Sequence, residues 1–237
     1  MVDLSKYKNI VVLTGAGISA ESGIKTFRDQ NGLWEGHDIA TVASPQGFER
    51  DPQLVHDFYN LRRSQLNDNN IAPNPAHYAL SNFEKEFMGD LTIVTQNVDN
   101  LHERSGSQNI LHMHGELLKV RCIRTAKTYN YSQNLSENNI CECCQIPGNL
   151  RPHIVWFGEI PLHMNQIQEK LETCDLFVSI GTSGVVYPAA MFVQIAKTNS
   201  AYCIEFNQEK TQISSHFDEC ITGPASVTVP RFFSCSK

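Results

Sequence analysis

The chain has 237 residues, of which 41% are hydrophobic, and carries a formal net charge of -6 with an isoelectric point of about 5.8. This length suits one large α/β domain, or one domain with an inserted module. The acidic balance and the lack of a basic block argue against a protein that binds nucleic acid through general electrostatics. No apolar run approaches the length of a membrane span, so we expect no membrane partner.

The N-terminal sequence and the cysteines indicate the compartment. Met1–Lys6 lack the charged-then-apolar order of a signal peptide, and we expect a cytoplasmic protein. All eight cysteines lie at or after Cys122, and four of them fall between Cys122 and Cys144. A secreted disulfide scaffold would be shorter and more evenly stapled, so this cluster suggests metal binding. We expect a monomer, although the sequence leaves the oligomeric state open.

The first element in the chain is an apolar run, Ile10–Leu13, which reads as a buried parallel strand. Gly15, Gly17 and Ala20 follow it in a GxGxxA pattern. In such a turn the glycines let the backbone approach a pyrophosphate, and the next helix turn offers N–H groups to the anion. Similar turns also occur in folds that bind no nucleotide, and Ser19 could simply cap a helix.

Further strands and helices alternate along the chain. The strand-like runs lie at 91–95, 154–157, 176–180 and 201–206, with a sixth candidate at 226–229. Helix-like periodicity lies between them, as at 75–87 and 188–198. Continuous apolar strands that alternate with helices predict an α/β fold, a Rossmann-like parallel sheet with helices on both faces.

Two regions interrupt this alternation. Residues 31–70 contain helical sequence where a plain Rossmann domain would place its second strand and an acidic residue for the ribose. Residues 116–153 carry the cysteines and few apolar residues, so this stretch needs a staple such as a metal. We predict a Rossmann-like domain from 1–30, 71–115 and 154–237, and a small domain from 31–70 and 116–153.

Polar residues follow several of the predicted strands. Gln96, Asn97 and Asp99 come directly after the strand at 91–95. Ligands of open α/β sheets gather at the carboxyl ends of strands, and amides and a carboxylate suit ribose hydroxyls and a carboxamide. Polar caps and Asx turns are the alternative interpretation. Two later groups are also placed to meet a nucleotide: Gly181, Thr182 and Ser183, and then Asn207, Gln208 and Glu209.

His112 and His114 stand two residues apart and would share a face in extended backbone, so a metal pair is conceivable. Gly115 would let a ligand approach His114 closely. A lone histidine is more often structural than catalytic, and His114 gains weight only from its neighbours.

Arginines near two motifs could bind anions. Arg28, beside the glycine-rich turn, could neutralise a pyrophosphate. Tyr59 and Arg62 lie at i, i+3 on one helix face and could bind a carboxylate together, because arginine pairs with carboxylates in a fork. A solvated surface arginine is the alternative in both cases.

The cysteines at 122, 141 and 144 are similar to a zinc ribbon with two C-x2-C knuckles. The position that should pair with Cys122 is Thr125, and threonine is a poor zinc ligand. Cys122, Cys141 and Cys144 therefore remain as ligands, with Cys143 or water as a fourth. A metal-free remnant held by packing is the alternative.

Together these motifs resemble the sirtuin family of NAD-dependent protein deacylases. The matching segments run in family order over nearly the whole chain: Gly15–Asp29, Thr95–Asp99, His114–Gly115, the cysteine cluster, Phe157–Glu159 and Gly181–Ser183. The Tyr59 and Arg62 pair is similar to the subgroup that removes acidic acyl groups, and the bacterial CobB-type deacylases match best.

The resemblance implies that NAD and an acylated lysine meet in a cleft between the two domains. It implies deacetylation and desuccinylation that release nicotinamide, O-acyl-ADP-ribose and free lysine. His114 matches the family's general base, Asn97 and Asp99 orient ribose and nicotinamide, and Phe27 shields the reacting centre.

The resemblance implies further contacts and leaves other functions open. It adds Ala16, Trp34, Val98 and Ala225 to the cofactor contacts. The peptide would add as a strand between the segments Phe157–Glu159 and Val185–Tyr187, with Val155, Phe157, Gly158 and Glu159 as substrate contacts. A nucleotide-binding sensor without turnover is the alternative, and a dehydrogenase is disfavoured because no acidic residue follows an early second strand.

Overall fold

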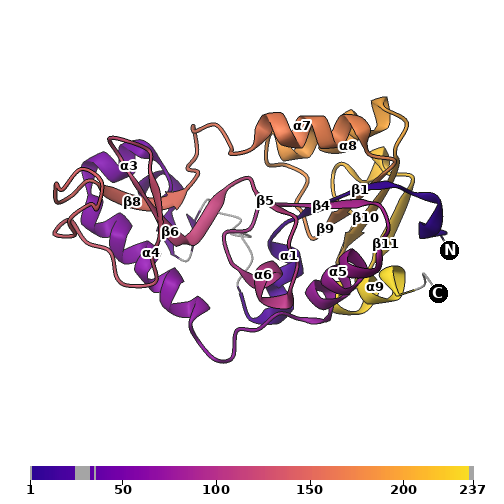
Figure 1. The fold of residues 1–237 in the computed structure, drawn as a ribbon, viewed down its shortest axis with the longest axis horizontal. Helices are drawn as coiled ribbons and strands as arrows, with labels where there is room; N and C mark the ends of the chain where they lie inside the picture. The colour runs from indigo at the N-terminus through magenta and orange to yellow at the C-terminus, as the bar shows by residue number, and fades with distance from the viewer. Residues whose placement is uncertain (1, 25–32, 35, 235–237) are drawn as a thin grey trace.

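The computed structural model describes residues 2–24, 33–34 and 36–234, and its largest element is a parallel sheet of six strands (Figure 1). The strands are β1 (Asn9–Thr14), β4 (Asp90–Thr95), β5 (Ile110–His112), β9 (Leu176–Ile180), β10 (Tyr202–Asn207) and β11 (Glu219–Thr222). Their order is β11-β10-β9-β1-β4-β5. This is the Rossmann order. The chain adds β4 and β5 on one side of β1, and then returns to add β9, β10 and β11 on the other side.

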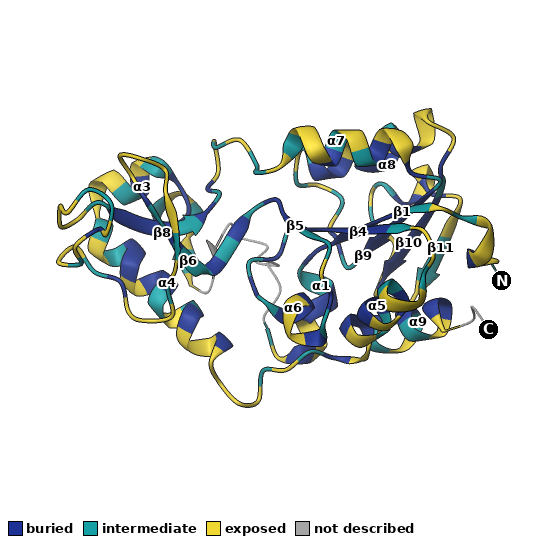
Figure 2. Ribbon diagram, viewed as in Figure 1, coloured by how far each residue is buried: buried dark blue, intermediate teal, exposed yellow. Residues whose placement is uncertain are grey.

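Helices cover both faces of this sheet, as Figure 2 shows from the buried strands between two helical layers. Ile10 and Val12 of β1 belong to the core shared with α5 (Pro75–Glu86) and α9 (Ala225–Phe233). Val11 and Leu13 belong to the core shared with α7 (Met164–Thr173) and α8 (Phe192–Thr198). Successive side chains of a strand point to opposite faces, so a strand buried on both faces must be apolar throughout. The predicted fold class is confirmed.

A second, smaller lobe lies at the left of Figure 1. Its sheet has three antiparallel strands in the order β7-β6-β8, which span Thr128–Asn130, Gly115–Cys122 and Leu150–Ile154. The helices α2 (Ile39–Val42), α3 (Pro45–Arg50) and α4 (Pro52–Leu66) belong to this lobe. The aromatic side chains of Phe58, Tyr59 and Trp156 are central to its core.

Short elements complete the described structure. They are η1 (Leu4–Lys6), α1 (Ala16–Ser19), η2 (Ala20–Ser22), β2 (Leu33–Trp34), β3 (His37–Asp38), α6 (Leu101–Ser105), η3 (Ala189–Met191) and η4 (Ser214–His216). None of the described helices is long and apolar enough to cross a bilayer. The domain boundaries stay a prediction. The separation of the strands into a six-stranded and a three-stranded sheet supports it.

Two predicted strands were wrong. Residues 154–157 are not a strand of the parallel sheet: Ile154 ends β8, and the chain then leaves the small sheet to bury Trp156. Residues 226–229 lie in α9, because Val229, Phe232 and Phe233 recur at the helical spacing that packs against α5. Strands β5 and β11 were missed, since each is an edge strand of only three or four residues.

Candidate active site

Two glycine-containing loops cross at the carboxyl end of the parallel sheet, where the strand order reverses. The N–H of Gly15 donates to the carbonyl of Ile180 (3.0 Å), and the N–H of Gly17 donates to the carbonyl of Gly181 (2.9 Å). A Cβ atom on Gly17 would lie 2.6 Å from the Cα of Gly181, which itself has a φ of +63°. These positions therefore need glycine to bring the loops after β1 and β9 together.

The helix that follows the first loop is short. The single turn α1 passes directly into η2, with Ala16 and Gly17 half-buried and Ala20 exposed. Three predicted cofactor contacts cannot be placed here: Phe27 and Arg28 lie outside the described residues, and only the backbone of Trp34 is described.

The loop after β4 places two polar side chains in the protein interior. The Asn97 amide Nδ2 donates to the carbonyl of Gly15 (3.2 Å) and to Ser19 Oγ (3.1 Å). Ser19 Oγ in turn donates to Asp99 Oδ2 (3.0 Å), and the N–H of Leu101 donates to Asp99 Oδ1 (3.0 Å). Burial raises the pKa of Asp99, although these two hydrogen bonds oppose the rise. Ser19, which the sequence suggested only as a helix cap, thus joins the loops after β1 and β4.

Two threonines lie beneath this loop and were not expected at the site. Thr14 Oγ1 at the end of β1 donates to Thr95 Oγ1 at the end of β4 (2.9 Å), and Thr95 Oγ1 also accepts from the N–H of Asn97 (3.0 Å). His102 Nε2 lies 3.0 Å from Thr14 Oγ1. The only available signal was that both strands end in threonine.

His114 is positioned by the same loop. Its Nδ1 lies 3.0 Å from the backbone carbonyl of Gln96, and this oxygen can only accept. Nδ1 must therefore carry the proton, which leaves a lone pair on Nε2. Burial lowers the pKa of His114, with the bond to Gln96 acting in the opposite direction. The environment thus favours the neutral ring, with an unprotonated Nε2.

The loops after β9 and β10 also meet. Asn207 Nδ2 donates to the carbonyl of Thr182 (2.6 Å), and Thr182 Oγ1 lies 3.0 Å from Ser179 Oγ. Ser183, Gln208 and Glu209 are exposed at this edge. Ala225 begins α9 and is buried.

A cavity of about 230 Å³ lies between α4, the loop after β4 and the segment around Ile24. It is lined by Gly23, Ile24, Arg62, Gln65, Leu66, Asp68, Ile71, Val98, Asp99 and Leu117. Arg62 and Asp99 thus face one space, although they are 37 residues apart in the chain. We call this space the Arg62 cavity.

Tyr59 and Arg62 share a helix but have different surroundings. Tyr59 is fully buried, and its hydroxyl accepts a hydrogen bond from Trp156 Nε1 (3.0 Å). Arg62 Nε donates to Gln65 Oε1 (3.1 Å), and its guanidinium carbon lies 4.6 Å from the centre of the Phe58 ring. Only Arg62 of the pair lines the cavity, so their joint binding of a carboxylate stays a prediction.

The predicted peptide segment is tied to the site by its backbone. The N–H of Val155 donates to the carbonyl of His114 (2.9 Å), and the N–H of Phe157 donates to that of Ala43 (2.9 Å). Phe157 and Gly158 are exposed, as are Val185 and Tyr187 on the other predicted peptide segment.

Glu159 serves the turn that precedes it. Its carboxylate accepts from Arg151 Nη1 (2.7 Å), Arg121 Nη2 (2.8 Å) and the N–H of Trp156 (2.8 Å). These bonds occupy the carboxylate, so Glu159 orders the backbone around Phe157.

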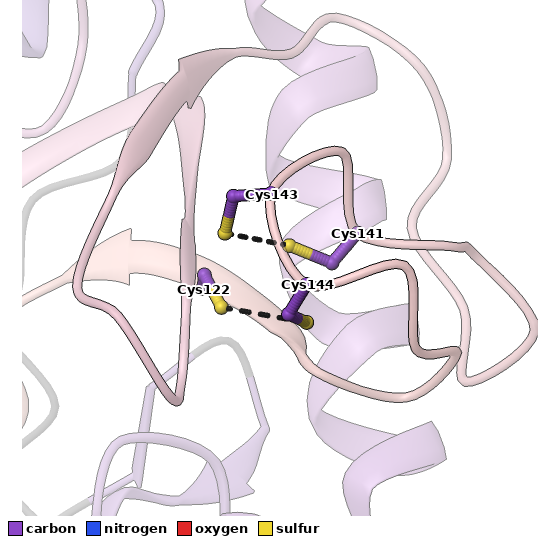
Figure 3. A group of neighbouring side chains, drawn as sticks. All are labelled: Cys122, Cys141, Cys143 and Cys144. Carbon is purple, nitrogen blue, oxygen red and sulfur yellow. Dashed lines mark hydrogen bonds between the residues drawn. The ribbon is translucent and has the colours of Figure 1, made fainter.

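The small lobe gathers four cysteines (Figure 3). The sulfurs of Cys122, Cys141, Cys143 and Cys144 all lie within 4.8 Å of one another, with 3.8 Å between Cys122 and Cys144 and 3.4 Å between Cys141 and Cys143. Zinc–sulfur bonds of about 2.3 Å give sulfur–sulfur edges of about 3.8 Å in a tetrahedron, so the four thiols fit a zinc ion. Thr125 Oγ1 lies 3.0 Å from Cys143 Sγ, and this threonine's hydrogen bonds lower the pKa of Cys122 to about 6.

Comparisons with known proteins agree with this geometry. The Sir2 family model matches residues 15–188. A protein of Vibrio parahaemolyticus named NAD-dependent protein deacylase is 59% identical over 95% of this chain and 93% of its own length. The chain belongs to the Sir2 family. The sirtuin resemblance of its motifs is thereby confirmed.

Solved sirtuin structures have the same fold. The crystal structure of a Sir2 homolog–NAD complex is 34% identical, with a TM-score of 0.87, and the match covers 98% of this chain and 90% of that one. The structure of Sir2Af2 bound to a myristoylated histone peptide is 35% identical, with a TM-score of 0.75 and coverage of 98% and 92%.

Proposed function

We propose that this sirtuin is an NAD-dependent protein-lysine deacylase that removes acetyl and succinyl groups. The observation that carries the proposal is His114, a neutral histidine fixed by the Gln96 carbonyl beside the buried Asn97 and Asp99. The deacylase relatives and the NAD-bound structural neighbour support the NAD-dependent deacylation.

The described residues fit NAD by the chemistry of their donors and acceptors. The loops at Gly15–Gly17 and Gly181–Ser183 would approach the phosphates and a ribose, with Asn207, Gln208, Glu209 and Ala225 at the far end. Asn97 and Asp99 would hold the nicotinamide end at the Arg62 cavity, with Gln96 and Val98 beside them. Bound NAD supplies a glycosidic bond to nicotinamide that breaks when the acyl oxygen bonds to the ribose.

His114 would act as the general base on a ribose hydroxyl. Its Nε2 lone pair is available because Nδ1 is committed to Gln96, and its lowered pKa keeps the ring neutral. The Ser19 and Thr95 hydroxyls keep Asn97 and Asp99 in place, so the binding groups need little reorganisation.

The acyl group would enter the Arg62 cavity. A succinyl carboxylate needs a cationic partner once it is removed from water, and Arg62 lines this space. An acetyl group needs only the apolar walls. We infer that both acyl groups are accepted, with Tyr59 supporting the wall through Trp156.

The protein substrate would lie along the exposed Phe157 and Gly158 on one side and Val185–Tyr187 on the other. Backbone hydrogen bonds of a strand-like peptide tolerate many sequences. The neighbour bound to a myristoylated histone peptide supports an acylated peptide as substrate class.

We further infer a structural zinc ion held by Cys122, Cys141 and Cys144, with Cys143 as fourth ligand. Cys143 lies beside the Thr125 hydroxyl and so takes the place that Thr125 leaves open. Such a site would hold β6 against the segment at 141–144 and has no part in the reaction.

The proposal is tested by incubating the protein with NAD and acetylated or succinylated peptide. We expect nicotinamide release that requires both substrates, and mass spectrometry should detect O-acyl-ADP-ribose. NAD binding without nicotinamide release would instead favour a sensor and would refute the proposal.

A further inference from the structure

His112 is a buried histidine that forms an ion pair with the exposed Glu103, and the proposed mechanism does not use this pair. The residue ends β5, and its side chain is 8% exposed. Its Nε2 lies 2.5 Å from Glu103 Oε1 of α6. A charge-assisted contact of this length between elements is stronger than an ordinary neutral hydrogen bond.

The charged and titratable groups around His112 come from every neighbouring element. Glu103 and His102 belong to α6, Asp99 to the loop after β4, and Glu116 to β6, where it accepts from Lys119 Nζ (2.7 Å). A ring nitrogen of His112 and one carboxylate oxygen from each of Glu103 and Glu116 all lie within 4.8 Å of one another. The positive charges of protonated His112 and Lys119 equal in number the negative charges of Glu103 and Glu116. The four side chains therefore form an ion-pair network without net charge.

The environment favours the charged form of His112. Burial lowers its pKa, but the hydrogen bond and charge of Glu103, the charge of Glu116 and the nearby Asn97 backbone outweigh it, and the net pKa is raised. Within the described structure Nδ1 forms no hydrogen bond of ordinary geometry, so Glu103 is the main partner of the ring. His114, only two residues away, has a lowered pKa.

The loop 95–99 and the segment 113–117 are joined by hydrogen bonds, and we call this junction the seam. The His112–Glu103 pair adds a further link across it. Three hydrogen bonds cross this seam: Met113 N–H to the Thr95 carbonyl (3.0 Å), His114 Nδ1 to the Gln96 carbonyl (3.0 Å) and Leu117 N–H to the Val98 carbonyl (2.9 Å). Glu103 follows the same loop in sequence, while His112 precedes His114. The ion pair therefore joins the segment after the loop, at Glu103, to the segment before His114, at His112.

We propose that His112, paired with Glu103, is a positioning residue that holds the loop 95–99 and His114 in catalytic register. The inference rests on the proposed function. Loss of the proton from His112 replaces an ion pair with a neutral contact and loosens the seam. Activity should therefore fall on the acidic side as His114 is protonated, and on the alkaline side as His112 is deprotonated.

Glu103→Gln tests this, because it removes the charge and keeps a hydrogen-bonding side chain. We expect the alkaline limb of kcat/KM to move to lower pH, with roughly tenfold less activity at alkaline pH, while the acidic limb stays in place. Glu86→Gln, at an exposed position on α5, is the matched control and should leave both limbs unchanged. An unchanged alkaline limb in Glu103→Gln would overturn the proposal.

A second measurement does not depend on turnover. Histidine ring NMR, with the His112 signal assigned through His112→Gln, should show a ring pKa above the ordinary 6.5 that falls in Glu103→Gln. An ordinary or lowered His112 pKa in the wild type would also overturn the proposal. If the wild type consumed no NAD, the proposed function would fail, and the ring titration would still decide whether His112 is the charged partner.

Discussion

We propose that one guanidinium, that of Arg62, distinguishes an acidic acyl group from a neutral one. Arg62→Met leaves a succinyl carboxylate unpaired in the Arg62 cavity, whereas an acetyl group loses no polar partner. An unpaired buried charge costs about 1.5–3 kcal/mol, so we expect kcat/KM for desuccinylation to fall about 10- to 100-fold more than that for deacetylation.

The measurement is a comparison of both activities in Arg62→Met and in Arg50→Met, where an exposed arginine of α3 is removed. The control should preserve the ratio of the two activities. An equal loss of both activities in Arg62→Met would argue against this role for Arg62.

At the residue scale, the sequence predicts those site residues whose position follows from a strand end. Gln96, Asn97 and Asp99 directly follow an apolar run, and the site rule for parallel sheets then places them. Ser19 was missed as a partner of Asp99, and Thr14 as a partner of Thr95. Their partners lie about 80 residues away in the chain, and no local pattern shows such a hydrogen bond.

At the scale of elements, we expect the small sheet to depend on a zinc ion held by the four cysteines. Metal analysis should find close to one zinc ion per chain, and chelation should lower the melting temperature, because a ribbon with so few apolar residues loses its staple. Cys143→Ser should weaken zinc retention, and Thr125→Cys in the same chain should restore it by rebuilding the usual knuckle.

Cys220→Ser removes a thiol outside the cluster and should leave zinc content unchanged. Full zinc retention by Cys143→Ser would show that another group is the fourth ligand.

The prediction of helices and strands succeeded where the spacing of apolar residues fits one kind of element. The run at 10–13 is apolar at every position and became β1, which is buried on both faces. The run at 154–157 is also apolar and the run at 226–229 contains two valines, but their partners are Phe58 and Tyr59 in the small lobe and α5 in the large one. Short apolar runs do not distinguish a strand from a loop or helix packed in a core.

At the scale of the whole molecule, we expect buried neutral histidines to contribute to the dependence of stability on pH. Burial lowers the pKa of His56 and His77 to about 4, and that of His102 well below its ordinary value. In the unfolded chain each has a pKa of about 6.5, so the unfolded state takes up protons first as the pH falls. The contribution of these three histidines to the free energy of unfolding should therefore be largest above pH 6.5 and fall towards pH 4, by up to about 1.4 kcal/mol per pH unit for each histidine.

His56→Leu isolates one of these contributions. Neither ring nitrogen of His56 has a hydrogen-bond partner among the described residues, and the ring packs edge-on against Phe48. Denaturant unfolding at several pH values should show a shallower acidic loss in His56→Leu, whereas His216→Gln, at an exposed position, should leave it unchanged. An unaltered slope in His56→Leu would refute the contribution of this group.

The architecture of the whole molecule could be predicted because several motifs follow predicted strands and occur along the chain in the order of the sirtuin family. The crossing of the loops at Gly17 and Gly181, and the cavity shared by Arg62 and Asp99, needed three-dimensional structure, since each joins segments that are distant in the sequence.

We infer above all that His114 is the base of an NAD-consuming reaction. The direct test compares wild type and His114→Ala for NAD binding and for nicotinamide release with an acetylated peptide. We expect the variant to bind NAD and to lose about 10²- to 10⁴-fold in turnover, because the base is gone while the loops remain. Normal turnover by His114→Ala would contradict the claim.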